Sequence, residues 1–236
     1  MTFHRFFIDF DNAIRTDGEL RITDSKLAHQ LFKVLRKKSG DEIILLDDKG
    51  NEYLSEVRTL TSKFLIAKIL RTSRNQNEPA LKITLCPSLI KASRFEWMLE
   101  KGTEIGVSVF TPILTSRSEA KNFKTERVSK IMKESAEQCE CGLIPKINDA
   151  ESFNEIIKKA GSNSIFLDRS GVPISSVIKK FRDKKSISIF VGPEGGWTIE
   201  EINLARDRGI EIVGLGPRVF RAETAAIAAC SILLSI

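Results

Sequence analysis

The sequence of 236 residues predicts an α/β protein in which a largely parallel sheet follows a small β-rich domain. In residues 80–236, apolar runs rich in β-branched side chains alternate with segments of helical periodicity, a pattern typical of a parallel sheet covered on both faces. In residues 1–72, short alternating runs dominate, which favours a separate β-rich domain. Residues 72–79 contain no apolar side chain before Pro79 and are typical of a linker.

The first domain is predicted to contain one helix among its strands. Leu27, Leu31 and Leu35 recur at helical spacing, so a helix is expected from Asp24 to about Lys38. Turn-forming residues separate the alternating runs on either side of it. Strands are expected at Phe3–Phe10, Glu42–Leu46, Tyr53–Val57 and Phe64–Leu70.

The second domain is predicted to alternate between strands and helices. Its expected strands are Leu81–Leu85, Val107–Leu114, Ser164–Leu167, Ser186–Val191 and Ile210–Leu215. Its expected helices are Arg94–Ile105, Glu126–Cys139, Ser152–Lys159, Ile174–Phe181 and Ile199–Arg208. The carboxyl ends of parallel strands meet at one edge of a sheet, where open α/β sheets bind their ligands.

Two loops at that edge are rich in glycine and proline. Phe190-Val-Gly-Pro-Glu-Gly-Gly-Trp197 and Leu215-Gly-Pro-Arg-Val-Phe-Arg-Ala-Glu-Thr224 each follow a predicted strand and precede a helical pattern. Thr198-Ile-Glu-Glu201 is a capping box that begins the helix after the first loop. Glycine lets the backbone approach a ligand closely, so the loops predict a small-molecule pocket built largely of backbone. A Walker loop is absent, and Gly214-Leu-Gly216 lacks the third glycine of a dinucleotide site.

Composition restricts the class of partner and of metal chemistry. The chain has 37 Lys and Arg against 31 Asp and Glu, and this basic excess favours an anionic partner such as nucleic acid. Its four cysteines and two histidines lack zinc-site spacing, so no metal is expected. The N-terminal residues Met-Thr-Phe-His-Arg have no apolar h-region, so they are not expected to be a signal peptide. The apolar stretch Ala225–Ile236 is too short to span a membrane, so a cytoplasmic protein is expected.

The two loops resemble those of the RsmE family, which belongs to the SPOUT methyltransferases. The similar residues are Gly192-Pro-Glu-Gly-Gly196 and Leu215–Thr224, and further matches are His29–Arg36, Glu100–Gly106 and Glu137-Gln138. The resemblance implies methylation of uridine N3 in small-subunit (16S) ribosomal RNA, with S-adenosylmethionine as methyl donor. It also implies a PUA-like RNA-binding β-barrel in residues 1–72 and a trefoil-knotted methyltransferase domain in residues 80–236. Knots are rare, and no periodicity in a sequence predicts one.

The resemblance also implies which residues hold the methyl donor. They are Leu167, Gly192, Pro193, Glu194, Gly195, Gly196, Leu215, Gly216, Arg218, Val219, Phe220 and Thr224. Because N3 of uracil carries a proton, methyl transfer needs a proton acceptor and a cation near the flanking carbonyls. Arg221, Glu223 and Glu194 are therefore the catalytic candidates. Glu223 could instead have only a structural role, in which its negative charge stabilises the N-terminus of the last helix by interacting with the helix dipole.

Two basic runs are the candidate RNA-binding surfaces, although such runs are often only solvated faces. Their residues are Lys26, His29, Lys33, Arg36 and Lys37 in the first domain, and Lys121, Lys124 and Arg127 in the second. Family members usually have an arginine shortly after the Glu-Gln pair, where this chain has Cys141 next to Glu140. Either another basic residue replaces that contact or RNA affinity is lower.

The sequence leaves two other functions open. The chain could be a SPOUT methyltransferase that acts on another RNA position, or a ribosome-assembly factor that binds RNA without catalysis. The apolar C-terminal segment Ala225–Ile236 predicts a homodimer, because a helix that is apolar on nearly all faces must be covered all round. Burial within one chain is the alternative. The exact target nucleotide and the residue that accepts the N3 proton are not predicted.

Overall fold

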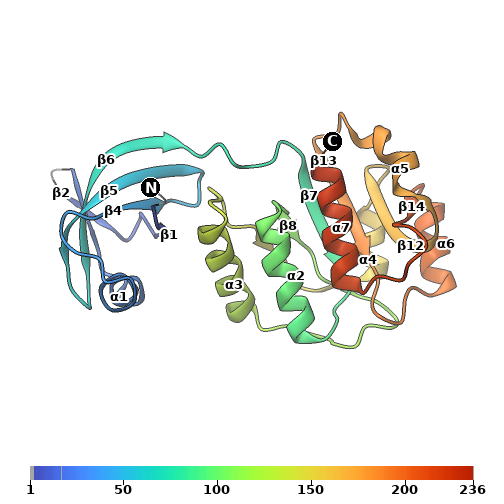
Figure 1. Cartoon of the computed structure of the whole chain (residues 1–236). Coiled ribbons are helices and arrows are strands. Elements are labelled where there is room, and N and C mark those ends of the chain that lie inside the picture. Colours follow the sequence, from blue (N-terminus) through green and yellow to red (C-terminus); the bar gives the residue numbers. More distant parts are fainter. Residues whose placement is uncertain (1–2, 17, 236) are drawn as a thin grey trace. The chain divides into compact units, whose positions relative to one another are not determined.

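The computed structural model describes residues 3–16 and 18–235, which form two compact units (Figure 1). The first unit comprises Met1–Glu78 and Ala136–Leu143, and the second comprises Pro79–Ser135 and Ile144–Ile236. Among the described residues, no helix is long and apolar enough to cross a membrane.

The first unit is built on one six-stranded sheet with the order β1-β4-β5-β6-β3-β2. The strands are β1 (Arg5–Phe7), β2 (Ile14–Thr16), β3 (Glu19–Ile22), β4 (Glu42–Leu46), β5 (Asn51–Leu60) and β6 (Leu65–Arg74). Strands β1 and β4 are parallel, and every other pair is antiparallel. Inward-facing residues of the sheet, among them Leu20, Ile43 and Leu45, form one core with Leu27 and Leu31. The sequence patterns missed β2 and β3, and β1 is shorter than predicted.

The predicted helix of the first unit ends earlier than expected. Asp24 caps α1 (Ser25–His29) by accepting from the backbone N–H of Lys26. A π-helical turn, Gln30–Val34, continues the helix. Arg36 then adopts a left-handed backbone with φ of 52°, so the predicted end at Lys38 is wrong.

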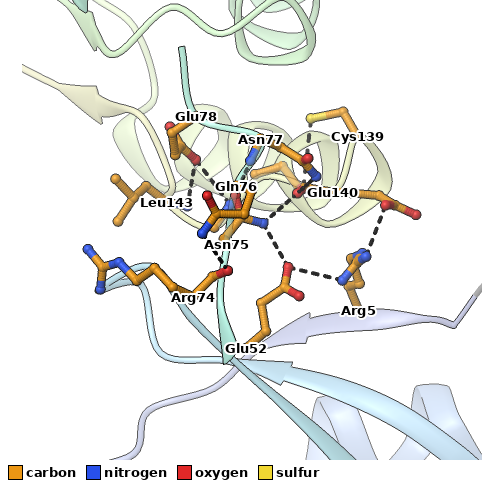
Figure 2. Close-up of polar contacts among 12 residues, drawn as sticks. Arg5, Glu52, Arg74, Asn75, Gln76, Asn77, Glu78, Cys139, Glu140 and Leu143 are labelled. Carbon is orange, nitrogen blue, oxygen red and sulfur yellow. Dashed lines mark hydrogen bonds and ion pairs between the residues drawn. The ribbon is translucent and has the colours of Figure 1, made fainter. Parts of the chain in front are cut away.

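A polar network inside the first unit joins its sheet to the segment 136–143 (Figure 2). The Asn75 side-chain amide donates to Glu52 Oε1 at 2.7 Å and to the Glu140 carbonyl oxygen at 2.9 Å. Arg5 pairs with the same two residues, at 3.2 Å from Glu52 and 2.9 Å from the Glu140 carboxylate. A Cβ atom on Gly142 would lie 2.5 Å from Asn75, so glycine is required there. Strand β6 also extends to Arg74, into the segment predicted as a linker.

The second unit contains a parallel sheet with the order β10-β8-β7-β13-β12-β14. The strands are β7 (Lys82–Pro87), β8 (Val109–Phe110), β10 (Lys146–Ile147), β12 (Ser164–Pro173), β13 (Ser186–Val191) and β14 (Glu211–Gly214). A separate parallel pair joins β9 (Ile113–Leu114) to β11 (Glu151–Ser152). The single strand predicted over 107–114 is divided into β8 and β9 at Pro112, which has no N–H to donate.

Helices cover both faces of this sheet. The helices are α2 (Ala92–Glu104), α3 (Thr125–Gln138), α4 (Phe153–Lys159), α5 (Ile174–Val177), α6 (Ile199–Asp207) and α7 (Ala222–Leu234). One core packs strand residues such as Leu85 and Ile189 against α2, α3, α5 and α7. The other packs Phe166 and Phe190 against α4 and α6. The predicted parallel α/β sheet is therefore confirmed, whereas the trefoil knot stays a prediction.

Candidate active site at the carboxyl ends of strands β12, β13 and β14

The two glycine-rich loops meet because β13 and β14 lie on either side of β12. In the register of the sheet, Leu167 is paired with Val191 on one side and with Val213 on the other. At this edge β13 and β14 end and the pairing of β12 with β14 becomes irregular between Leu167 and Val172. The chain here encloses a hollow of about 360 Å³. The hollow is lined by Leu167–Arg169, Val191–Glu194, Gly196, Trp197, Val213–Gly216, Arg218–Ala222 and Ala225.

Trp197 fixes the first loop against β12. Its indole is buried, and Nε1 donates to the Leu167 carbonyl oxygen at 2.8 Å. A Cβ atom on Gly192 would lie 2.9 Å from this indole. The close packing against Trp197 therefore explains why residue 192 is glycine, without any contact to a ligand. Gly196 and Gly216 are different, because both have positive φ and an added Cβ would meet no atom within 4 Å. Their open side leaves room beside the loop backbone.

Most of the predicted donor-binding residues line this hollow, but two do not. Gly195 is exposed, and an added Cβ there would contact the side chain of Arg117. Thr224 lines a neighbouring hollow instead. Val219 and Phe220 do line this hollow and are 70% and 40% exposed, so both leave apolar surface open at its edge.

Arg117 is a loop-fixing residue that the sequence analysis missed. Its guanidinium donates to the carbonyl oxygens of Gly195 at 2.7 Å and Trp197 at 3.2 Å. It lies in the segment after β9, far from both loops in sequence, so no local pattern could have indicated the contact.

The two carboxylates proposed for catalysis come together at Arg94, another residue that the sequence analysis missed. Arg94 lies in the first turn of α2, and its Nη1 is 3.0 Å from Glu194 Oε1. Its Nε is 3.8 Å from Glu223 Oε1. Glu223 is only 8% exposed, and its Oε2 has no hydrogen-bond partner in the part of the chain that the structure describes. A buried carboxylate oxygen without a donor is costly, which favours a role for Glu223 in binding a ligand.

Arg221 lies at the N-cap of α7, directly before the turn that contains Glu223. Its backbone is extended, and its own side chain forms no capping hydrogen bond with α7. The exposed Arg221 borders this hollow and also the neighbouring hollow that Thr224 lines. Glu223 in the first turn also interacts favourably with the helix dipole, so the structural role considered for it stands beside its candidacy for catalysis.

The RNA-binding candidates are mostly exposed. Lys26, His29, Lys33 and Arg36 are exposed in the first unit and Lys37 is half-buried, while Lys121, Lys124 and Arg127 are exposed in the second. Arg127 already forms a two-point ion pair with Glu96, at 2.5 and 2.7 Å. The hydrogen bonds from Arg127 lower the pKa of the Glu96 carboxyl. Because Glu96 already neutralises part of the Arg127 charge, Arg127 should bind a phosphate more weakly than Lys121 or Lys124 does.

The buried cysteines are packing residues. Burial raises the pKa of the Cys86 and Cys230 thiols to about 12, so neither is a reactive thiolate near neutral pH. Within residues 3–16 and 18–235, no group of three or more His, Cys, Asp or Glu side chains could hold a metal ion.

Comparison with known proteins identifies the family. A model described as an RNA methyltransferase domain matches residues 76–234, and one described as an RNA methyltransferase PUA domain matches residues 22–70. A ribosomal RNA small subunit methyltransferase E from Synechocystis is 35% identical over 216 residues, covering 89% of this chain and 70% of that protein. The chain belongs to the ribosomal RNA small subunit methyltransferase E family. The predicted family and the PUA-like first domain are thus confirmed.

Two further members of this family are similar over nearly their whole length. The methyltransferase E of Bacillus subtilis is 27% identical over 249 residues, covering 96% of this chain and 94% of that protein. The structure of the Neisseria gonorrhoeae methyltransferase E, bound to S-adenosylmethionine, matches with a TM-score of 0.87 at 25% identity. That match covers 99% of this chain and 98% of the Neisseria chain.

Proposed function

We propose that this protein transfers a methyl group from S-adenosylmethionine to N3 of one uridine in small-subunit (16S) ribosomal RNA. The observation that carries the proposal is the hollow at the ends of β12, β13 and β14, which Arg221 and Glu194 border and beside which Glu223 lies. The donor bound to the Neisseria relative supports the same choice of donor here.

The lining of the hollow fits the proposed donor. Leu215, Val219 and Phe220 offer apolar surface for a planar base, and the backbone near Gly196 and Gly216 is open to hydrogen bonding. Its volume of about 360 Å³ lies within the range of small-molecule sites. Arg218 supplies a cation for the donor carboxylate or for an RNA phosphate. When bound, S-adenosylmethionine supplies an activated methyl group on a cationic sulfur.

The side chains beside the hollow supply the remaining chemistry. Glu223, or alternatively Glu194, accepts the N3 proton, and the N3 electron pair then forms the new bond to the methyl carbon while the carbon–sulfur bond breaks toward sulfur. Arg221 stabilises the negative charge that develops on the flanking uracil carbonyls. Because the donor already contains a good leaving group, this reaction needs no metal ion.

We place RNA recognition in both domains, with residues 1–72 as the RNA-binding domain and residues 80–236 as the catalytic domain. The exposed basic residues around α1 support the first assignment, and Lys121 and Lys124 support the second. The RNA is within the small ribosomal subunit in this proposal, which also places the enzyme in the cytoplasm.

Homodimer formation through α7 is a further part of the proposal. One side of α7, including Ala226, Ala229 and Leu233, is buried in its own chain. The side with Ile227 and Leu234 is only half-buried, so the chain by itself does not cover this apolar helix all round. A second copy would cover it at a two-fold interface.

Nucleoside mapping tests the reaction. Ribosomal RNA from a strain without this protein should lack one N3-methyluridine, and the purified protein with S-adenosylmethionine should restore it. Restoration of a ribose methyl or of another methylated base would indicate a different RNA position. Donor binding by calorimetry without any methylation would instead favour the non-catalytic assembly factor.

A further inference from the structure

A second hollow lies between the N-terminal turns of α2 and α7. Its volume is about 490 Å³, and it is lined by Ser93, Arg94, Trp97, Arg221, Glu223 and Thr224. We propose that this hollow receives the acceptor uracil, with Trp97 as the surface on which the base stacks and Arg94 as a donor to one of its carbonyls. The inference rests on the proposed function and extends it to the substrate subsite.

The position of the second hollow suits an acceptor. Arg221 lines both hollows, so a base here lies beside the donor pocket. Arg94 links the two sites, because it pairs with Glu194 in the wall of the donor hollow and contacts Glu223 in the wall of this one. The reacting atoms would therefore meet next to Arg221, the cation proposed to stabilise the developing charge.

The polar groups of the hollow match the edge of uracil. That edge presents a carbonyl, an N–H and a second carbonyl, in the order acceptor, donor, acceptor. Arg94 and Arg221 are donors in the lining of this hollow, and Glu223 in the same lining is an acceptor. The Glu223 carboxylate retains a buried oxygen, Oε2, with no partner among the described residues, so this side chain has the capacity to accept a further hydrogen bond. Cytosine fits worse, because its N3 has no proton and its amino group would face a guanidinium.

Trp97 provides the surface on which a base removed from its RNA stack can rest. It lies one helical turn after Arg94 on α2, so both side chains share a face of the helix. Trp97 is 41% exposed although it is the largest kind of apolar side chain. Enzymes that modify a base commonly hold it by stacking and read its polar edge.

The test compares Trp97→Ala with Trp97→Phe, because phenylalanine retains a stacking surface. Single-turnover methylation is measured at saturating S-adenosylmethionine over a range of concentrations of the ribosomal RNA that the wild type methylates. Trp97→Ala should raise the half-saturating RNA concentration about 5- to 150-fold, the usual effect of losing one stacked base. Trp97→Phe should remain within a few-fold of the wild type. Ile199→Ala, which removes another exposed apolar side chain outside the hollow, should have no effect.

A binding experiment gives a readout that needs no turnover. With S-adenosylhomocysteine present, RNA containing the target uridine should quench tryptophan fluorescence more than the same RNA with cytidine there. Because the chain has only Trp97 and Trp197, the difference should disappear in Trp97→Phe. Arg94→Ala should abolish the preference for uridine over cytidine while retaining binding of S-adenosylhomocysteine.

Wild-type RNA dependence in Trp97→Ala would overturn the subsite while leaving the proposed function intact. A Trp97→Ala protein that becomes monomeric by light scattering would also overturn it, because Trp97 would then belong to a subunit interface. Absence of N3-methyluridine with the wild type would refute the proposed function itself, and the uracil subsite with it.

Discussion

Arg221 is the residue at which the donor hollow and the proposed uracil hollow meet. If Arg221 stabilises charge that develops only during methyl transfer, Arg221→Ala should lower the single-turnover rate at saturating RNA and donor. The expected loss is about 100- to 1,000-fold, which is the effect of removing one hydrogen-bond donor that stabilises a transition-state charge in other enzymes. The affinity for S-adenosylhomocysteine, measured by calorimetry, should change much less. Arg206→Ala removes an exposed arginine on α6 and is the matched control. A rate equal to that of the control would exclude Arg221 from the chemical step.

Glu223 is buried and has one oxygen without a partner among the described residues. If its carboxylate accepts the N3 proton, Glu223→Gln should react most slowly relative to the wild type at low pH. The deficit should shrink at alkaline pH, because hydroxide then removes the proton from uracil. Single-turnover rates across pH check this dependence. Equal rates for variant and wild type at every pH would leave Glu194 or solvent as the acceptor.

At the scale of elements, two glycines with the same backbone conformation follow different elements. Gly196 is in the loop after β13 and lines the donor hollow, whereas Gly209 follows α6 and does not line that hollow. Both have φ of 68° and open space around an added Cβ, so they form a matched pair. Gly196→Val and Gly209→Val should each lose about 1–3 kcal/mol of stability through backbone strain. Only Gly196→Val should lose donor binding in calorimetry. Equal donor binding in both variants would contradict the placement of the donor.

The turn between β4 and β5 is closed by Asp47. Its carboxylate accepts from the backbone N–H groups of Lys49 at 2.8 Å and Asn51 at 3.0 Å, and from the side chains of Asn51 and Tyr53. Burial alone raises the pKa of Asp47, but these hydrogen bonds outweigh it and the net pKa is lowered.

A lowered folded-state pKa makes the stabilisation by Asp47 pH-dependent. The stabilisation is fully present above the pKa of an unfolded aspartate, about 3.9, and is lost as the pH falls through the lower folded value. Asp47→Asn should therefore destabilise the protein at pH 7 and lose less further stability on acidification than the wild type. Urea unfolding at pH 7 and at pH 3 measures both. A parallel loss in both proteins would mean that the turn does not titrate.

At the scale of the whole molecule, α7 links the site to the proposed homodimer. Its N-terminal turn contains Glu223, while its half-buried Ile227 and Leu234 lie further along the helix. Light scattering at micromolar concentration should give the mass of a dimer, and Ile227→Glu should give that of a monomer with an unchanged circular dichroism spectrum. Ile199→Glu, at an exposed position on α6, should remain dimeric. A monomeric wild type would end the dimer proposal.

Much of the second unit could be predicted because its elements follow local rules. Strand β13 matches its prediction at both ends, and Thr198 and Glu201 form the expected capping box. The first unit was predicted less well. Strands β2 and β3 are three and four residues long, too short for an alternating pattern to be distinguished from a loop. The helix after Asp24 ends because Arg36 adopts a left-handed backbone, which its side chain does not foretell.

The sequence by itself determined the family, the parallel α/β sheet and the two loops that form the donor hollow, because glycines, prolines and apolar runs act on their immediate neighbours in the chain. Only the tertiary structure placed Arg94, Trp97 and Arg117 beside the two hollows or their loops. Arg94 reaches Glu194 and Glu223 across about 100 residues or more of sequence, and Arg117 reaches the loop at Gly195 from the segment after β9. Contacts between residues so far apart depend on how β13 and β14 are placed around β12, and no local pattern records that order.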